Sequence, residues 1–207
     1  MARAGEIVDL TGNGEEVLPT EAQRARRRRI LQAAAELATE GGFDAVQMRE
    51  VAERADVALG TLYRYFPSKI HLLVSVLADE MEELHDRLKA ASAGPESPAE
   101  RVFAVLQRAV RALGRNPSLY GAVVRAMMFG DESTTAENMV VSSRMEAIIT
   151  RAMTYGVGEP TDEDVAIARL IGKIWLADIL SWLAGRSDVK QMESDLELAV
   201  QLLVGRR

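Results

Sequence analysis

Residues 58–69 of the chain read "ALGTLYRYFPSK" and gather aromatic and basic side chains in a short span. Most aromatic side chains of water-soluble proteins are buried, so a cluster with cations beside it indicates a displayed surface. Just upstream, "QMREVAER" (47–54) predicts a short helix and "ADV" (55–57) a turn. Together with "ALGTLYRYF" (58–66), these segments predict a helix-turn-helix.

The turn of this motif usually contains glycine, because the backbone there takes a positive φ. The chain has Asp56 instead, and aspartate tolerates the left-handed region better than most residues. The first helix is predicted over residues 20–40, with one apolar stripe that can cover the motif. The apolar positions of the motif that can meet this stripe are Val51, Ala55, Val57, Leu62 and Phe66.

The net charge of −6 hides an uneven distribution along the chain. Residues 1–19 carry −3, residues 20–71 carry +2 and residues 72–207 carry −5. The arginine run "QRARRRR" (23–29) lies in the one basic segment. A run of this kind is most often a solvated helix face, but beside a helix-turn-helix it predicts contacts along phosphates or in a minor groove. From this run we assign Arg26 and Arg27 to a DNA interface.

Helix-start signals recur along the whole chain, and no alternating run bounded by hairpin residues predicts a strand. Each start pairs an N-cap side chain with an acid or amide three residues later: Thr20/Gln23, Ser97/Glu100, Thr134/Glu137, Thr161/Asp164 and Asp188/Gln191. Asn116 followed by Pro117 is a sixth start. The sequence therefore predicts an all-α fold of about nine helices.

The predicted helix 161–185 carries apolar residues around nearly its whole circumference, which indicates burial on more than one side. In a chain of 207 residues, a second subunit is a plausible second cover, with helix 188–204 completing a four-helix interface. The alternative is a central core helix within a monomer. The side chains assigned to the dimer interface are Ile171, Trp175, Ile179, Trp182, Leu196 and Leu203.

The composition excludes several classes of protein. The chain has no cysteine, which gives no sign of disulfides or thiolate chemistry and suits a cytoplasmic protein. The start of the chain lacks a secretion signal, and Arg169, Lys173 and Asp178 interrupt the longest apolar stretch, so we expect no membrane span. His71 and His85 lie outside any compact zinc spacing, so we expect neither a metal nor a cofactor.

The second helix of the motif has side chains suited to a major groove. Gly60 lets the backbone approach DNA closely, Thr61 can touch a phosphate or a thymine methyl, and the tyrosine hydroxyls can donate to phosphates. Lys69 begins the following helix, whose free N–H groups favour an anion. With two residues of the preceding helix, the predicted DNA contacts are Gln47, Arg49, Gly60, Thr61, Tyr63, Tyr65 and Lys69.

Residues 41–73, "GGFDAVQMREVAERADVALGTLYRYFPSKIHLL", resemble the N-terminal domain of the TetR family of bacterial transcriptional repressors and its "T-L-Y-x-Y-F-x-S-K" signature. The resemblance implies a helix-turn-helix DNA-binding domain, a helical domain that binds a small inducer, and a homodimer joined through the last two helices. Carried over by position, it adds Leu59 to the DNA contacts. We expect an acidic tail at 1–19, a DNA-binding domain at 20–67 and a ligand-binding and dimerisation domain at 68–207.

A narrower resemblance covers most of the chain. Segments that include "EAQRARRRRIL" (21–31), "RNPSLYGAVVRAM" (115–127) and "WLADILSWL" (175–183) are similar to the repressors of sterol degradation in actinobacteria. This resemblance implies a hydrophobic inducer from sterol catabolism, namely a coenzyme A thioester of a sterol-derived acid. Flexible methionines in residues 97–155 suit an adaptable apolar cavity, although most apolar side chains there fill the core. The residues assigned to the ligand are Phe103, Met127, Met145 and Trp175.

Two other classes of function compete with a DNA-binding regulator. An all-helical lipid-processing enzyme would need catalytic groups, but the carboxylates of "TDEDVA" (161–166) are explained by a helix start. A helical adaptor that binds other proteins would not need the displayed "TLYRYF" (61–66). The expected partners are therefore double-stranded operator DNA, a small hydrophobic inducer and a second copy of the chain.

Overall fold

The computed structural model describes residues 20–90, 97–130, 132–154 and 159–205. Over these residues the chain forms nine α-helices and one short 3-10 helix and contains no strand, which confirms the all-α prediction. The helices are α1 (Glu21–Ala45), α2 (Met48–Arg54), α3 (Leu59–Tyr65), α4 (Lys69–Ala90), α5 (Pro98–Arg115), α6 (Pro117–Phe129), α7 (Thr135–Thr154), α8 (Asp162–Leu183) and α9 (Val189–Leu203), with η1 (Glu132–Thr134) before α7. The predicted acidic tail, residues 1–19, lies outside the described residues.

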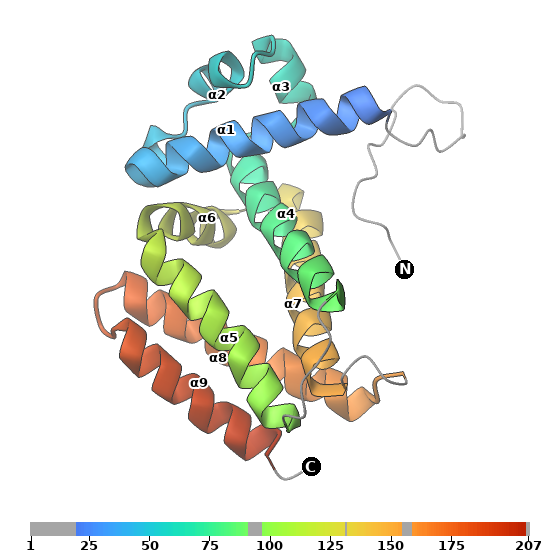
Figure 1. Cartoon of the computed structure of the whole chain (residues 1–207). Helices are drawn as coiled ribbons and strands as arrows, with labels where there is room; N and C mark the ends of the chain where they lie inside the picture. The colour runs from blue at the N-terminus through green and yellow to red at the C-terminus, as the bar shows by residue number, and fades with distance from the viewer. Residues whose placement is uncertain (1–19, 91–96, 131, 155–158, 206–207) are drawn as a thin grey trace.

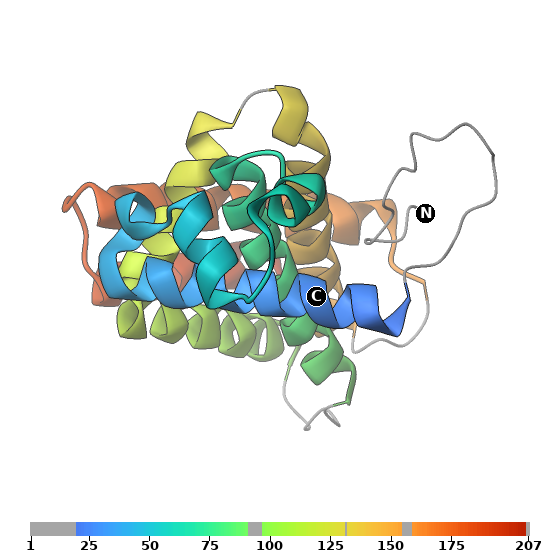
Figure 2. The ribbon, with the colours of Figure 1, turned by 90° about the horizontal axis from the view of Figure 1, so that it is seen from above.

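The N-terminal three helices form a unit at one end of the molecule (Figure 1). Helix α1 lies across the end of the larger helical body, and seen from above α2 and α3 lie along one side of it (Figure 2). Beneath α1, helix α6 packs against it, and α4 runs from the three-helix unit into the body. Helices α8 and α9 lie at the opposite end.

Five of the six predicted helix starts have the expected cap. Thr20, Ser97 and Thr161 each form a reciprocal capping box with the residue three positions on. Asp188 accepts a hydrogen bond from the backbone N–H of Gln191. Asn116 likewise accepts one from the N–H of Leu119, as its predicted role requires. The start predicted at Thr134 coincides with η1, which leads directly into α7.

The first helix continues beyond its predicted end at Gly41 and Gly42. These glycines form a kink, with φ of 68° at Gly42, and one further helical turn ends at Ala45. A Cβ at position 41 would lie 2.7 Å from the Cβ of Ala45, so the chain can turn this sharply only with glycine. The turn carries Phe43 and Asp44 over α6.

A single core joins the three-helix unit to the body. Ile30, Leu37, Leu62 and Phe66 belong to the same cluster of buried side chains as Leu72 and Leu73 of α4. Burial of large apolar side chains of this kind contributes roughly 1.5–3 kcal/mol each to folding. Helix α4 is therefore packed against both parts of the molecule.

The predicted dimer residues differ in how far a single protomer already buries them. Ile171, Trp175, Ile179 and Leu196 are buried in the protomer's own core, whereas Trp182 and Leu203 are partly buried. The sequence indicated that α8 is apolar on most sides but not which side the protomer covers. The apolar side chains that α8 and α9 leave exposed are Leu170, Leu183, Leu198 and Leu202.

None of the helices in the described part of the chain combines the length and apolar character that crossing a bilayer requires.

Candidate DNA interface and ligand cavity

Helix α3 carries five of the ten residues that the sequence assigned to DNA. Tyr63 is 46% exposed, and a Cβ added at Gly60 would meet no atom within 4 Å. Thr61 is partly exposed, whereas Leu59 and Tyr65 lean against the core and are only half-buried. The outer surface of α3 is therefore open at Gly60 and Tyr63.

Helix α2 adds two exposed polar side chains at its start. Gln47 is its N-cap residue, Arg49 lies in its first turn, and both are exposed. Asp56 takes the left-handed conformation with φ of 52°, as predicted for the turn between the two helices. The motif therefore has the helix-turn-helix geometry that the sequence predicted, with aspartate at the strained position.

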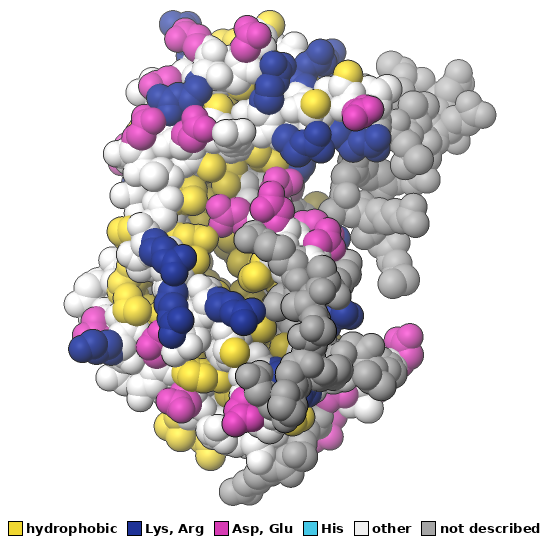
Figure 3. Space-filling model, viewed as in Figure 1, with side chains coloured by type: hydrophobic (Ala, Val, Ile, Leu, Met, Phe, Trp, Pro, Cys, Tyr) yellow, Lys and Arg dark blue, Asp and Glu magenta, His cyan; other side chains and the backbone are white. Residues whose placement is uncertain are grey.

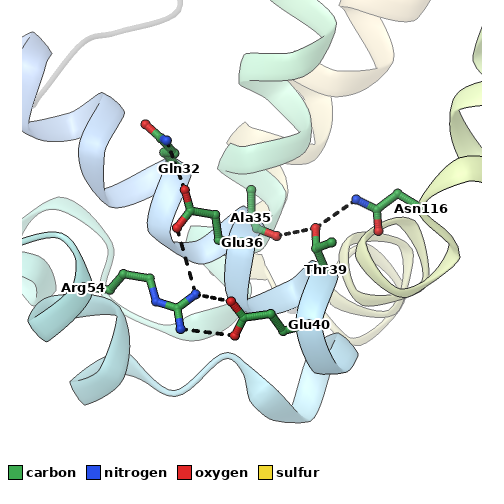
Figure 4. A network of polar contacts seen from close by, with 7 residues as sticks. All are labelled: Gln32, Ala35, Glu36, Thr39, Glu40, Arg54 and Asn116. Atoms are coloured by element: carbon green, nitrogen blue, oxygen red, sulfur yellow. Dashed lines mark hydrogen bonds and ion pairs between the residues drawn. The ribbon is translucent and has the colours of Figure 1, made fainter.

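An ion pair fixes α2 to α1 (Figure 4). Arg54 donates to both carboxylate oxygens of Glu40, at 2.6 and 3.1 Å, and lies 3.9 Å from Glu36. The hydrogen bonds from Arg54 hold the pKa of Glu40 below its ordinary value. A two-pronged contact of this type orients the short helix as well as attaching it.

Two of the predicted DNA contacts are engaged within the protein. Arg27 pairs with Asp79 of α4 at 3.1 Å and lies over the ring of Phe66. Lys69 donates to the carbonyl of Phe43 at 2.8 Å, and its ammonium lies 4.1 Å from the centroid of that ring. Desolvation lowers the pKa of Lys69, and Asp44 and Arg125 act on it in opposite directions. Of the other arginines in the run, Arg26 is partly exposed and Arg28 is exposed.

Behind this surface, helices α4 to α8 enclose a cavity of about 670 Å³. Its wall includes Met127, Met145 and Trp175, three of the four residues that the sequence assigned to a ligand. Phe103, the fourth, packs against the core and does not line the cavity. A cavity of this size and apolar character is typical of sites for small molecules.

Polar groups stand at the edges of the cavity. Tyr120 donates its hydroxyl to Glu80 at 2.9 Å, and Arg169 lies 3.4 Å from Glu146. Arg108 and Arg115 of α5 also line it and are exposed. Figure 3 shows a hollow with hydrophobic side chains at its bottom. Acidic side chains lie along one edge of the hollow and basic side chains along the other.

The residues predicted from the sequence to bind a ligand do not include several that line the cavity wall. Leu77 and Leu84 of α4, Tyr120 and Val123 of α6, and the arginines of α5 were not assigned to a ligand. Their apolar spacing is that of any amphipathic helix, so nothing in the pattern separates a wall residue from a core residue. Arg108 and Arg115 of α5 gave the one sequence pattern that could have indicated the site, because they lie seven residues apart and hence on one side of the helix.

Both halves of the chain match known domain families. Residues 30–76 match the family described as "Bacterial regulatory proteins, tetR family". Residues 95–203 match "Tetracyclin repressor-like, C-terminal domain". The first match covers the helix-turn-helix, and the second covers most of the helices that enclose the cavity.

The chain is also similar to curated proteins and to a solved structure. It is 48% identical over 192 residues to the HTH-type transcriptional repressor KstR of Rhodococcus jostii (strain RHA1), covering 93% of this chain and 89% of that protein. It is 44% identical over 191 residues to the KstR repressor of Mycobacterium tuberculosis (strain ATCC 25618 / H37Rv), covering 92% and 86%. A crystal structure of a TetR transcriptional regulator from Rhodococcus sp. RHA1 is 41% identical and superposes with a TM-score of 0.79, covering 88% of this chain and 97% of that one.

Proposed function

Because the chain belongs to the TetR family of bacterial regulatory proteins, we propose that it represses transcription from operator DNA as a homodimer and is released by a hydrophobic inducer. The relatives that align with more than nine tenths of the chain are named transcriptional repressors, and the chain is a regulator rather than an enzyme. Its place of action is the cytoplasm, where bacterial DNA lies.

The observation that carries this proposal is the pairing of an open α3 surface with a separate apolar cavity in one continuous core. Tyr63 and Gly60 are presented outward, and the wall of the cavity begins on α4 at Leu77, one helix further along the chain. A regulator needs both sites and a mechanical connection between them. Helix α4 supplies that connection because it begins beside α3 and runs past the cavity.

The homodimer rests on the faces of α8 and α9. Leu198 and Leu202 are 59% and 61% exposed, and they lie four residues apart on one face of α9. Leu170 and Leu183 of α8 add further exposed apolar area. A second copy placed over these two helices would form a four-helix interface and bring two α3 helices to one duplex, as a two-fold operator requires.

For the inducer we propose a coenzyme A thioester of a sterol-derived acid, and hence a role in sterol catabolism. The cavity is wide, apolar and lined by flexible methionines, which suits a rigid multi-ring body. The exposed Arg108 and Arg115 at its edge suit an anionic group that remains near solvent. The resemblance to the KstR repressors makes this class of ligand the first to test.

Release follows from linkage between the two sites. A ligand that prefers the conformation with wrongly spaced α3 helices must weaken DNA binding by the same factor. A shift from almost fully bound to almost fully free requires a preference of roughly 10⁴-fold, about 5.5 kcal/mol. In this proposal α4 moves as a lever and the α8–α9 contact stays closed.

The test uses an operator duplex selected by the protein from random-sequence DNA. Fluorescence anisotropy would follow that complex during a titration with cholestenoyl-CoA, and light scattering would report the mass of the free protein. We expect the DNA complex to dissociate while the protein keeps the mass of a dimer. Failure to select any sequence would disprove the regulator, and dissociation into monomers would disprove the lever.

A further inference from the structure

Helix α6 contacts both the ligand cavity and the three-helix unit. Tyr120, Val123 and Met127 lie in the cavity wall. At the start of the same helix, Asn116 donates its side-chain N–H to the hydroxyl of Thr39 of α1 at 2.8 Å, as Figure 4 shows. A displacement of α6 by a bound ligand would therefore act directly on α1.

Arg125 makes the second contact between α6 and the three-helix unit. Its Nη1 lies 3.2 Å from Oδ2 of Asp44, and its guanidinium carbon lies 4.4 Å from the centroid of the Phe43 ring. Both partners belong to the turn that follows the kink at Gly42. The ion pair and the ring contact together fix the position of this turn on α6, because the strength of each contact depends on the distance and orientation of the Arg125 guanidinium.

The same phenylalanine holds the first residue of α4. Lys69 binds the carbonyl oxygen of Phe43 and places its ammonium 4.1 Å from the ring centroid. Two cations from two different helices thus share one aromatic residue, and Arg125 is among the groups that lower the pKa of Lys69. Because like charges repel, the position of Arg125 influences how firmly Lys69 is held.

We propose that Arg125 is a positioning residue that passes the movement of α6 to the start of α4 through Phe43 and Lys69. The inference rests on the proposed function, since it assigns a second route to the regulation of the same cavity. When the cavity fills, α6 moves under α1, the contact of Arg125 with Phe43 and Asp44 changes, and Lys69 loses or alters its binding site. The start of α4, and with it α3, then takes a different position.

The absence of cysteine from the chain allows a test that needs no known inducer. A Met127→Cys variant carries one thiol in the cavity wall, and N-(1-pyrenyl)maleimide attached there serves as a tethered apolar ligand. The labelled and unlabelled proteins are compared for affinity toward the selected operator duplex. The same pair is prepared with Arg125→Ala, with Arg125→Lys and, as a control, with Arg111→Ala, which breaks an exposed ion pair to Glu193 on α9.

With Arg125 present we expect the label to weaken operator binding roughly tenfold, within the usual range of coupling between sites. With Arg125→Ala the label should change the affinity by less than about threefold, and Arg125→Lys should restore part of the effect because the charge remains. The Arg111→Ala protein should respond like its parent. An equal response in the Arg125→Ala background, or no response in any background, would overturn the inference.

A second readout does not involve DNA. Lys69 is one of four lysines in the sequence, so its signal can be assigned after reductive methylation with ¹³C-formaldehyde. We expect the label at position 127 to shift the pKa of Lys69 when Arg125 is present and to leave it unchanged in Arg125→Ala. An unmoved Lys69 in the parent would refute the relay even if operator binding responds, whereas a protein that selects no operator would refute the proposed function instead.

Discussion

Asp56 occupies the most constrained backbone position of the helix-turn-helix. Its φ of 52° lies in the left-handed region of the backbone, which residues with a Cβ atom rarely adopt. Aspartate is among the few residues that reach this conformation at modest cost, and glycine reaches it at none. The geometry of the turn therefore depends on what stands at position 56.

We expect Asp56→Ala to lower the free energy of unfolding by about 1 kcal/mol, because alanine is strained in the left-handed region. Asp56→Gly should be close to neutral, because relief of strain is offset by the greater freedom of the unfolded chain. Urea denaturation of the two variants beside the parent protein measures the difference. If the alanine variant is as stable as the glycine variant, the turn is not held in this conformation.

Tyr63 provides a test of the open α3 surface at the level of one hydroxyl. In Tyr63→Phe we expect weaker binding to all duplexes alike, by roughly 1 kcal/mol, because a phosphate contact carries no sequence information. The salt dependence should not change, since no charge is removed. Binding isotherms at several salt concentrations, with selected and unselected duplexes, check both points. A changed sequence preference would place Tyr63 against base edges instead.

At the scale of the element, the position of α2 depends on its contacts with the rest of the fold. A helix of seven residues is marginal in isolation, and its orientation comes from Val51 and Ala52 in the core and from Arg54 outside it. The Arg54 guanidinium fits both oxygens of Glu40, a fit that lysine cannot reproduce.

A carboxyl titration can verify this contact. Hydrogen bonds from Arg54 keep the pKa of Glu40 below 4.5, so the pair stabilises the fold above pH 4.5 and loses this contribution as the pH falls through the lowered pKa. In Arg54→Ala we expect the pKa of Glu40 to rise toward its ordinary value. NMR titration of the glutamate carboxyls in both proteins measures it, and an unchanged pKa would mean that the pair is not formed in solution.

The elements themselves were largely predictable from the sequence. Caps such as Ser97/Glu100 are local, so the residues that form them stand three positions apart and can be recognised without the fold. The kink at Gly41 and Gly42 was predicted only as a helix end, because the turn that follows it is held by α6, far away in the sequence. The buried side of α8 could not be predicted for the same reason.

The α3 surface was easier to predict from the sequence than the ligand cavity was. The α3 surface consists of neighbours in the sequence, and Gly60 and Tyr63 are exposed there as its display requires, whereas Leu59 and Tyr65 are half-buried against the core. The internal roles of Arg27 and Lys69 depend on Asp79 and Phe43, which only the folded chain brings near them. The cavity draws on five helices, so its full wall emerges only from their packing.

At the scale of the molecule, the decisive feature is the apolar face that α8 and α9 leave open. Exposed leucines on two adjacent helices are unfavourable for a protein that remains a monomer in water. We expect Leu198→Glu/Leu202→Glu to convert the proposed dimer into monomers, because charges would be buried without partners. Light scattering gives the mass, and operator binding should fall with it.

A control for this variant is Gln107→Glu on α5, which adds one of the two negative charges at a position outside the proposed interface. It should remain dimeric and bind operator DNA normally. A double variant that keeps the mass of a dimer would show that the two protomers meet on another surface.

The wall of the cavity comes from α4 to α8 alone, and no residue of α1, α2 or α3 takes part in it. Substitutions that adapt the cavity wall to a different metabolite therefore leave the DNA-binding helices, and the operator sequence that they would recognise, unaltered. A lineage of such proteins can change the nutrient it senses in small mutational steps, while the genes under its control stay the same.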